Sequence, residues 1–89
     1  MHRYLIERNI PGAEKMGPGD LKAAAQKSNA VLHELGPDVQ WVHSFVAKDT
    51  IFCEYLAKDE EIVREHARKS GFPANRITQV NAVLDPTMA

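Results

Sequence analysis

The sequence has no long apolar run and no surplus of charge of one sign. No segment approaches the roughly 20 apolar residues that a membrane-spanning helix needs, so we expect no membrane partner. Arg3, Glu7 and Arg8 interrupt the segment where a signal peptide would be continuously apolar, which favours a cytoplasmic location. With 11 basic and 12 acidic residues the formal net charge is −1, which provides no positive excess for binding phosphates. Nucleic acid is therefore not an expected partner.

Cysteine is almost absent, and so are the common motifs of cofactor binding and hydrolysis. Cys53 is the only cysteine, so an internal disulfide cannot form, as expected for a reducing compartment. There is no internal repeat, no glycine-rich phosphate loop, no paired-cysteine motif and no nucleophile elbow. Standard cofactor-dependent and hydrolase functions therefore have no support.

The 89 residues are enough for one small domain spanning residues 1–89. Hydrophobic periodicity and the positions of glycine, proline and capping residues predict six elements in the order strand, helix, strand, strand, helix, strand. Asp20 and Asp59 are the predicted helix N-caps. The predicted ranges are 2–9, 21–35, 39–46, 51–57, 60–70 and 76–84.

This order predicts an α+β fold of the ferredoxin-like, split β-α-β type. Right-handed crossovers place both helices on one face of a four-stranded antiparallel sheet and leave the other face bare. A chain of this length buries only roughly 60 to 65% of its unfolded surface, so an isolated copy is marginal. We therefore expect a homodimer of the dimeric α+β barrel type, formed through the helix-free face.

The central hairpin carries the most chemistry, and its register decides which side chains share a face. If Lys48 and Asp49 form the tip, paired residues have numbers that sum to 97. One face then holds the pairs Val46–Ile51, Ser44–Cys53 and Val42–Tyr55, and the other holds Phe45–Phe52, His43–Glu54 and Trp41–Leu56. Both faces carry bulky apolar groups, which supports burial of the helix-free face by a second protomer.

The first predicted face gathers a hydroxyl, a thiol and a phenol, from Ser44, Cys53 and Tyr55. His66 lies on the apolar face of the second predicted helix and points toward the sheet. A cysteine and a histidine within reach of each other can bind nickel or zinc, or can activate a thiolate. The structural alternative is a buried small side chain for Cys53 and a hydrogen-bonded core histidine for His66.

The second predicted face pairs His43 with Glu54, with Trp41 diagonal to them. Two stacked sheets would bring two copies of this pair together as nitrogen and oxygen ligands for a metal, whereas the structural alternative is a plain ion pair at a dimer interface. We expect Ser44, Tyr55 and Trp41 to contact a bound ligand, and His43, Cys53, His66 and Glu54 to be the metal ligands.

Four segments, "RYLIER", "GPDVQWVHSFV", "FCEYLAKDEEIVREHARKSGFPANRI" and "VLDPT", resemble the family of small bacterial proteins classified as domain of unknown function 4242. One branch of that family is described as nickel-binding, with a ferredoxin-like fold and a dimeric assembly. The resemblance therefore implies a dimer that binds a divalent metal, with nickel favoured over zinc. Glu54 departs from the family, in which this strand position is more often apolar.

Two other functions stay open at the level of sequence. One is a cofactor-free enzyme of the dimeric α+β barrel type, such as a monooxygenase or isomerase acting on a small organic molecule. His66 or Glu7 would then be the general base, and Tyr55 or Ser44 would orient the substrate. The other is an interaction module without a ligand.

Overall fold

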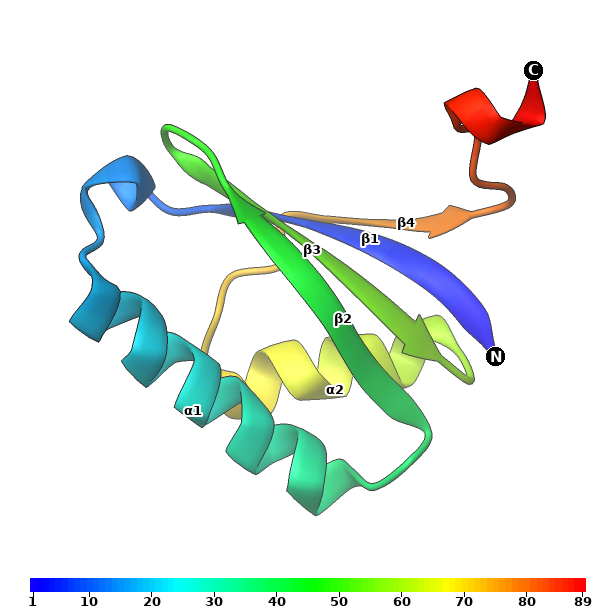
Figure 1. Ribbon diagram of the computed structural model, residues 1–89. Helices are drawn as coiled ribbons and strands as arrows, with labels where there is room; N and C mark the ends of the chain where they lie inside the picture. The colour runs from blue at the N-terminus through cyan, green and yellow to red at the C-terminus, as the bar shows by residue number, and fades with distance from the viewer.

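The computed structural model describes residues 1–89 and contains a single four-stranded antiparallel sheet with the strand order β2-β3-β1-β4. Both helices lie on one side of this sheet, as Figure 1 shows. The order of strands and helices is that of a ferredoxin-like fold, so the predicted fold class is confirmed. The elements are β1 (His2–Asn9), α1 (Pro18–Leu35), β2 (Val39–Val46), β3 (Thr50–Ala57), α2 (Glu60–Ser70) and β4 (Arg76–Val80), with short 3-10 turns at Ala13–Lys15 and Pro86–Met88.

Three element ends differ from the sequence-based prediction, and the smallest difference is in β3, which begins at Thr50 instead of Ile51. The first helix begins at Pro18, whose fixed φ suits a first helical turn, and Gly17 takes the N-cap position. Asp20 is thus inside the first turn, where its carboxylate accepts a hydrogen bond from the Gly17 amide at 3.0 Å. The last strand ends at Val80 because Val80 pairs with Arg3, almost at the start of β1, so the chain beyond it has little partner backbone left.

A β-bulge in β2 changes two of the six predicted hairpin pairs. The four pairs nearest the tip, including Ser44–Cys53 and His43–Glu54, are confirmed. Between Trp41 and His43 the register shifts, so Trp41 pairs with Tyr55. The predicted pairs Val42–Tyr55 and Trp41–Leu56 are therefore wrong, and Trp41 lies on the helix side of the sheet.

The hydrophobic core fills the space between the sheet and α2 and extends under the second half of α1. Its buried members are Tyr4, Ile6, Val39, Cys53, Tyr55, Ala57 and Val63. Leu32 and Leu35 of α1 pack against this cluster. In the first three turns of α1, by contrast, the positions at the same helical spacing hold the short side chains of Ala24, Ala25 and Ser28. The core is consequently well filled at one end of the domain and thin at the other.

The helix-free face of the sheet mixes charged and apolar side chains. Phe45 is 62% exposed there, while its partner Phe52 is half-buried. Leu5 and Leu56 lie nearby on β1 and β3 and are also half-buried. The face thus offers apolar contact area beside charged residues.

Candidate functional site

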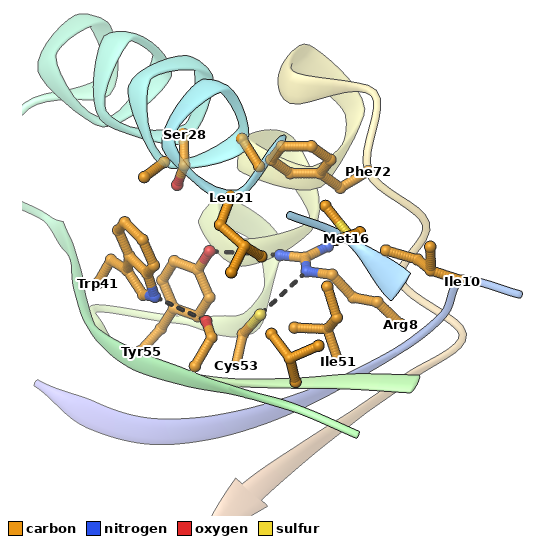
Figure 2. Close-up of a pocket in the computed structure, with 14 residues that line it drawn as sticks. Arg8, Ile10, Met16, Leu21, Ser28, Trp41, Ile51, Cys53, Tyr55 and Phe72 are labelled. Carbon is orange, nitrogen blue, oxygen red and sulfur yellow. Dashed lines mark hydrogen bonds between the residues drawn. The ribbon is translucent and has the colours of Figure 1, made fainter. Parts of the chain in front are cut away.

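A cavity of about 360 Å³ lies between the first half of α1 and the sheet, and Figure 2 shows its lining. The short side chains of Ala24, Ala25 and Ser28 leave this space open, because they do not reach the strands below them. The volume falls within the range of roughly 300 to 1,000 Å³ that is usual for small-molecule sites. The full lining is Arg8, Ile10, Met16, Leu21, Ala24, Ala25, Ser28, Trp41, Ser44, Val46, Ile51, Cys53, Tyr55 and Phe72.

Arg8 is the only charged residue of this lining, and only 2% of its surface is exposed. Its guanidinium donates to the Pro73 carbonyl at 2.8 Å, to Cys53 Sγ at 3.3 Å and to the Tyr55 hydroxyl at 3.3 Å. It also lies 5.7 Å from the centre of the Phe72 ring, within the range of a cation-π contact. All of these partners are neutral.

None of the seven ion pairs in the protein includes Arg8. Burial of a charge costs several kcal/mol unless an opposite charge and well-placed hydrogen bonds compensate for it. Here the hydrogen bonds and aromatic rings supply part of that compensation, and no carboxylate supplies the rest. The cavity wall therefore carries a positive potential that repels cations and attracts anions.

The bulge in β2 supplies two further groups to the cavity. It turns Trp41 toward the helix side, where the indole N–H donates to Ser44 Oγ at 2.9 Å (Figure 2). Ser44 lies across the ladder from Cys53, and Trp41 lies across from Tyr55. The predicted trio of Ser44, Cys53 and Tyr55 thus shares one face and lines one cavity, and a ligand contact by these residues stays a prediction.

Tyr55 is 2% exposed, and burial raises the pKa of its phenol above the ordinary value of 10, although the nearby charge of Arg8 opposes the shift. The phenol is therefore protonated at neutral pH. Since its oxygen accepts a hydrogen bond from Arg8, its own proton is available to a further acceptor.

His66 is completely buried behind this wall. Burial lowers its pKa from 6.5 to about 4, and the charge of Arg8 adds to the effect. Its ring lies 5.2 Å from the Tyr55 ring, and its Nε2 is 3.1 Å from Ser28 Oγ. Nδ1 has no hydrogen-bond partner. Buried N–H groups without an acceptor are rare, which favours the tautomer in which Nε2 carries the proton and donates to Ser28.

A second constellation lies on the opposite, helix-free face. His43 Nε2 is 3.1 Å from Glu54 Oε1, and the other carboxylate oxygen of Glu54 pairs with Arg3. A carboxylate only accepts hydrogen bonds, so the proximity of Glu54 favours a proton on Nε2 and leaves Nδ1 as the nitrogen with a lone pair for a metal. The His43 side chain is 51% exposed.

The predicted metal ligands are divided between the two faces. His43 and Glu54 lie on the helix-free face, whereas Cys53 and His66 lie on the helix side. No group of three or more histidine, cysteine, aspartate or glutamate side chains comes together within the chain. Of the two candidate general bases, Glu7 pairs with Arg76 on the helix-free face. His66 does not line the cavity and lies behind two of its lining residues, Ser28 and Tyr55.

Arg8 is the main residue that sequence reasoning missed. It follows the core residues Tyr4 and Ile6 with the strand period of two, so its direction toward the helices was readable. Phe72 and Pro73, which follow α2, cover the Arg8 side chain. No pattern in the sequence near Arg8 predicts these contacts.

Together, the topology and the cavity define a small ferredoxin-like α+β protein with a ligand-sized space between helix and sheet. The model of a family described as "Nickel responsive protein SCO4226-like" matches residues 4–80, and the chain belongs to this family. The resemblance seen in the sequence is thereby confirmed for the nickel-responsive group, although this match does not carry the designation 4242.

Comparison with solved structures supports the same fold. The chain is similar to the crystal structure of SCO4226 from Streptomyces coelicolor A3(2), with a TM-score of 0.77 and 20% sequence identity. The match covers 92% of this chain and 99% of the other. No curated protein matches the chain significantly. Neither helix has the length and apolar character needed to cross a membrane.

Proposed function

We propose that the protein is a homodimer that binds a divalent transition metal, nickel in preference to zinc, at the helix-free face of its sheet. The proposal rests on the position of His43, whose Nε2 lies 3.1 Å from Glu54 Oε1 and whose side chain is 51% exposed. Metal-binding histidines typically donate their second ring N–H to a carboxylate, and Glu54 lies close enough to His43 for that role. The name of the nickel-responsive family supports the choice of metal.

The donor chemistry of this face fits nickel, which is well served by imidazole nitrogen and by oxygen ligands. Glu54 already forms an ion pair with Arg3. We therefore propose that it orients the imidazole of His43 and does not bind the metal itself. The cavity on the helix side is less suitable, because Arg8 donates to Cys53 Sγ and its charge opposes a cation there. His43 is therefore the proposed ligand of each chain.

A single chain offers too few donors at this face, since it brings one imidazole and one carboxylate together. Two chains that stack their helix-free faces bring two such pairs to one interface. Phe45, 62% exposed, and the half-buried Leu5, Phe52 and Leu56 supply the apolar contact for this association. The proposal thus joins dimerisation and metal binding at the same surface.

Calorimetric titration of tag-free, metal-free protein with nickel chloride tests this function. We expect saturable binding with about one nickel per two chains, and a loss of affinity of at least about tenfold in His43→Ala. The matched control is His33→Ala, because His33 is exposed on α1 and should leave the titration unchanged. An absence of saturable binding, or a normal titration curve for His43→Ala, would sink the proposal.

A further inference from the structure

We propose that the cavity between α1 and the sheet binds a small aromatic monocarboxylate, whose carboxylate group is held by Arg8. This site is separate from the proposed metal site, from which the sheet itself divides it, and it does not depend on nickel binding. Three observations carry the inference: the charge of the lining, the free donors at that charge and the shape of the apolar remainder.

The charge selects an anion. Arg8 is the only charged residue in the lining, it is 2% exposed, and it has no ion-pair partner in the chain. Lys27 adds positive charge nearby, since its Nζ lies 5.9 Å from the centre of the Phe72 ring. In a site of low dielectric, such a charge favours a counter-ion far more strongly than it would in water.

The donors select a carboxylate. A guanidinium has five N–H groups, and three of those of Arg8 take part in the bonds to Pro73, Cys53 and Tyr55. The remaining N–H groups can donate to a carboxylate in the geometry that arginine prefers. The protonated phenol of Tyr55 adds a neutral donor beside them.

The remaining lining selects a flat apolar body. Trp41, Tyr55 and Phe72 present aromatic rings, and Met16 adds a polarisable sulfur that packs well against such rings. The alanines of α1 leave room for about a dozen water molecules, given a cavity of about 360 Å³ and ~30 Å³ per water. A body of one or two fused rings fits this space.

The cavity has an apolar rim. Leu21 and Val46 both line it and are 39% and 44% exposed, so they mark the side on which it reaches solvent. Leu21 belongs to the first turn of α1, and Val46 ends the edge strand β2. A ligand with one charged end would enter with that end toward Arg8 and leave its ring edge near the rim.

The test titrates wild-type protein with 2-naphthoate, 2-naphthamide and 2-naphthylmethylammonium, which share a ring system and differ in charge. The indole N–H resonance of Trp41, the only tryptophan, reports binding in two-dimensional NMR, and calorimetry gives the affinity. We expect 2-naphthoate to bind at least about tenfold more tightly than the amide, and the cation to be the weakest ligand. Acetate and inorganic phosphate, which lack the ring, should leave the Trp41 resonance unmoved.

Two sets of variants complete the test. Arg8→Gln should abolish the preference for 2-naphthoate over 2-naphthamide, and Arg8→Lys should keep part of it, while Arg76→Gln on the opposite face should change nothing. Ala24→Phe should block all three naphthyl probes by filling the cavity, whereas Ala23→Phe, one position along α1 and exposed, should not. The Ala24 pair keeps the test decisive if Arg8→Gln fails to fold.

Several results would overturn the inference: no saturable shift of the Trp41 resonance at millimolar 2-naphthoate, equal affinity for the acid and the amide, or undiminished binding in Ala24→Phe. A protein that binds 2-naphthoate but not nickel would leave this inference standing and remove the proposed function. A protein that binds nickel but not 2-naphthoate would leave the proposed function standing and remove this inference.

Discussion

His66 shows how one buried side chain makes stability depend on pH. Its pKa is about 4 in the folded protein and 6.5 as an ordinary histidine, because burial disfavours the charged ring. Between these values the unfolded chain binds more protons than the folded one, so the free energy of unfolding falls as the pH is lowered. The neutral ring therefore supports stability above pH 6.5, and that support is lost as the pH falls through 4.

We predict that His66→Gln removes this component of the pH dependence. In the wild type the component amounts to about 3 kcal/mol between pH 7 and pH 4. Urea denaturation of the two proteins at several pH values in this range measures it as the difference between their curves. His33→Gln, a change at an exposed histidine, should keep the wild-type slope. An unchanged slope in His66→Gln would show that the ring protonates in the folded state at ordinary pH.

Single residues also mark where sequence reasoning was sufficient and where it was not. The placement of His66 toward the sheet followed from helical spacing alone, and that of Ser44 and Cys53 followed from strand alternation. The burial of Arg8 did not, because it depends on Phe72 and Pro73, more than sixty residues away in the chain. Charge is normally a surface signal, so nothing local in the sequence indicates that this arginine is buried.

Among the helices and strands, α2 has the clearest start and stop signals in its own sequence. Asp59 accepts a hydrogen bond from the Ile62 amide at 2.9 Å, acidic residues occupy the first turn, and Gly71 ends the helix with a φ of 77°. A left-handed conformation at that position favours glycine. These signals all lie within the helix and its flanks, so the predicted bounds of α2 agree with the structure.

We predict that Asp59→Ala lowers the free energy of unfolding by about 1 kcal/mol, because an amide at the start of α2 loses its acceptor. Chemical denaturation at pH 7 measures the change. Asp38→Ala is the control: that carboxylate pairs with Lys58 across 3.7 Å, with both side chains 56% exposed, and should contribute less than about 0.5 kcal/mol. Equal effects for the two variants would mean that the cap is not the source of the stability.

The strands were less predictable at their ends and in their register. β4 ends at Val80 although the chain stays apolar at Val83 and Leu84, since strand length depends on the partner strand and not only on local propensity. The bulge at Val42 likewise depends on how β2 pairs with β3. Nothing in the alternation of β2 distinguishes a bulged strand from a regular one, so the sequence pattern predicts the wrong face for Trp41.

For the whole molecule, the exposed surface is larger than expected of an isolated chain. It amounts to 5884 Å², whereas a typical monomer of 9.9 kDa exposes about 5,200 Å². Part of the excess comes from the exposed carboxyl-terminal segment, 81–89, and part from the helix-free face with Phe45. A second copy on that face would reduce the excess.

We predict that the protein sediments as a dimer at micromolar concentration and that Phe45→Glu shifts it to a monomer, because a charge replaces an exposed apolar side chain at the proposed interface. Met88→Glu is the matched control, since Met88 is similarly exposed at 63% but lies in the carboxyl-terminal segment. Sedimentation velocity measures both variants. A monomeric wild type, or a dimeric Phe45→Glu, would contradict the prediction.

The bulge in β2 also has a consequence for comparing relatives. On either side of Val42 the odd-numbered residues of the strand face opposite ways, with Trp41 toward the cavity and His43 toward the helix-free face. An alignment of distant homologues that places a one-residue gap on the wrong side of Val42 would equate a cavity position with an interface position. At 20% identity, as with SCO4226, such an error is easy to make, so residue roles across this strand should be transferred only after structural superposition.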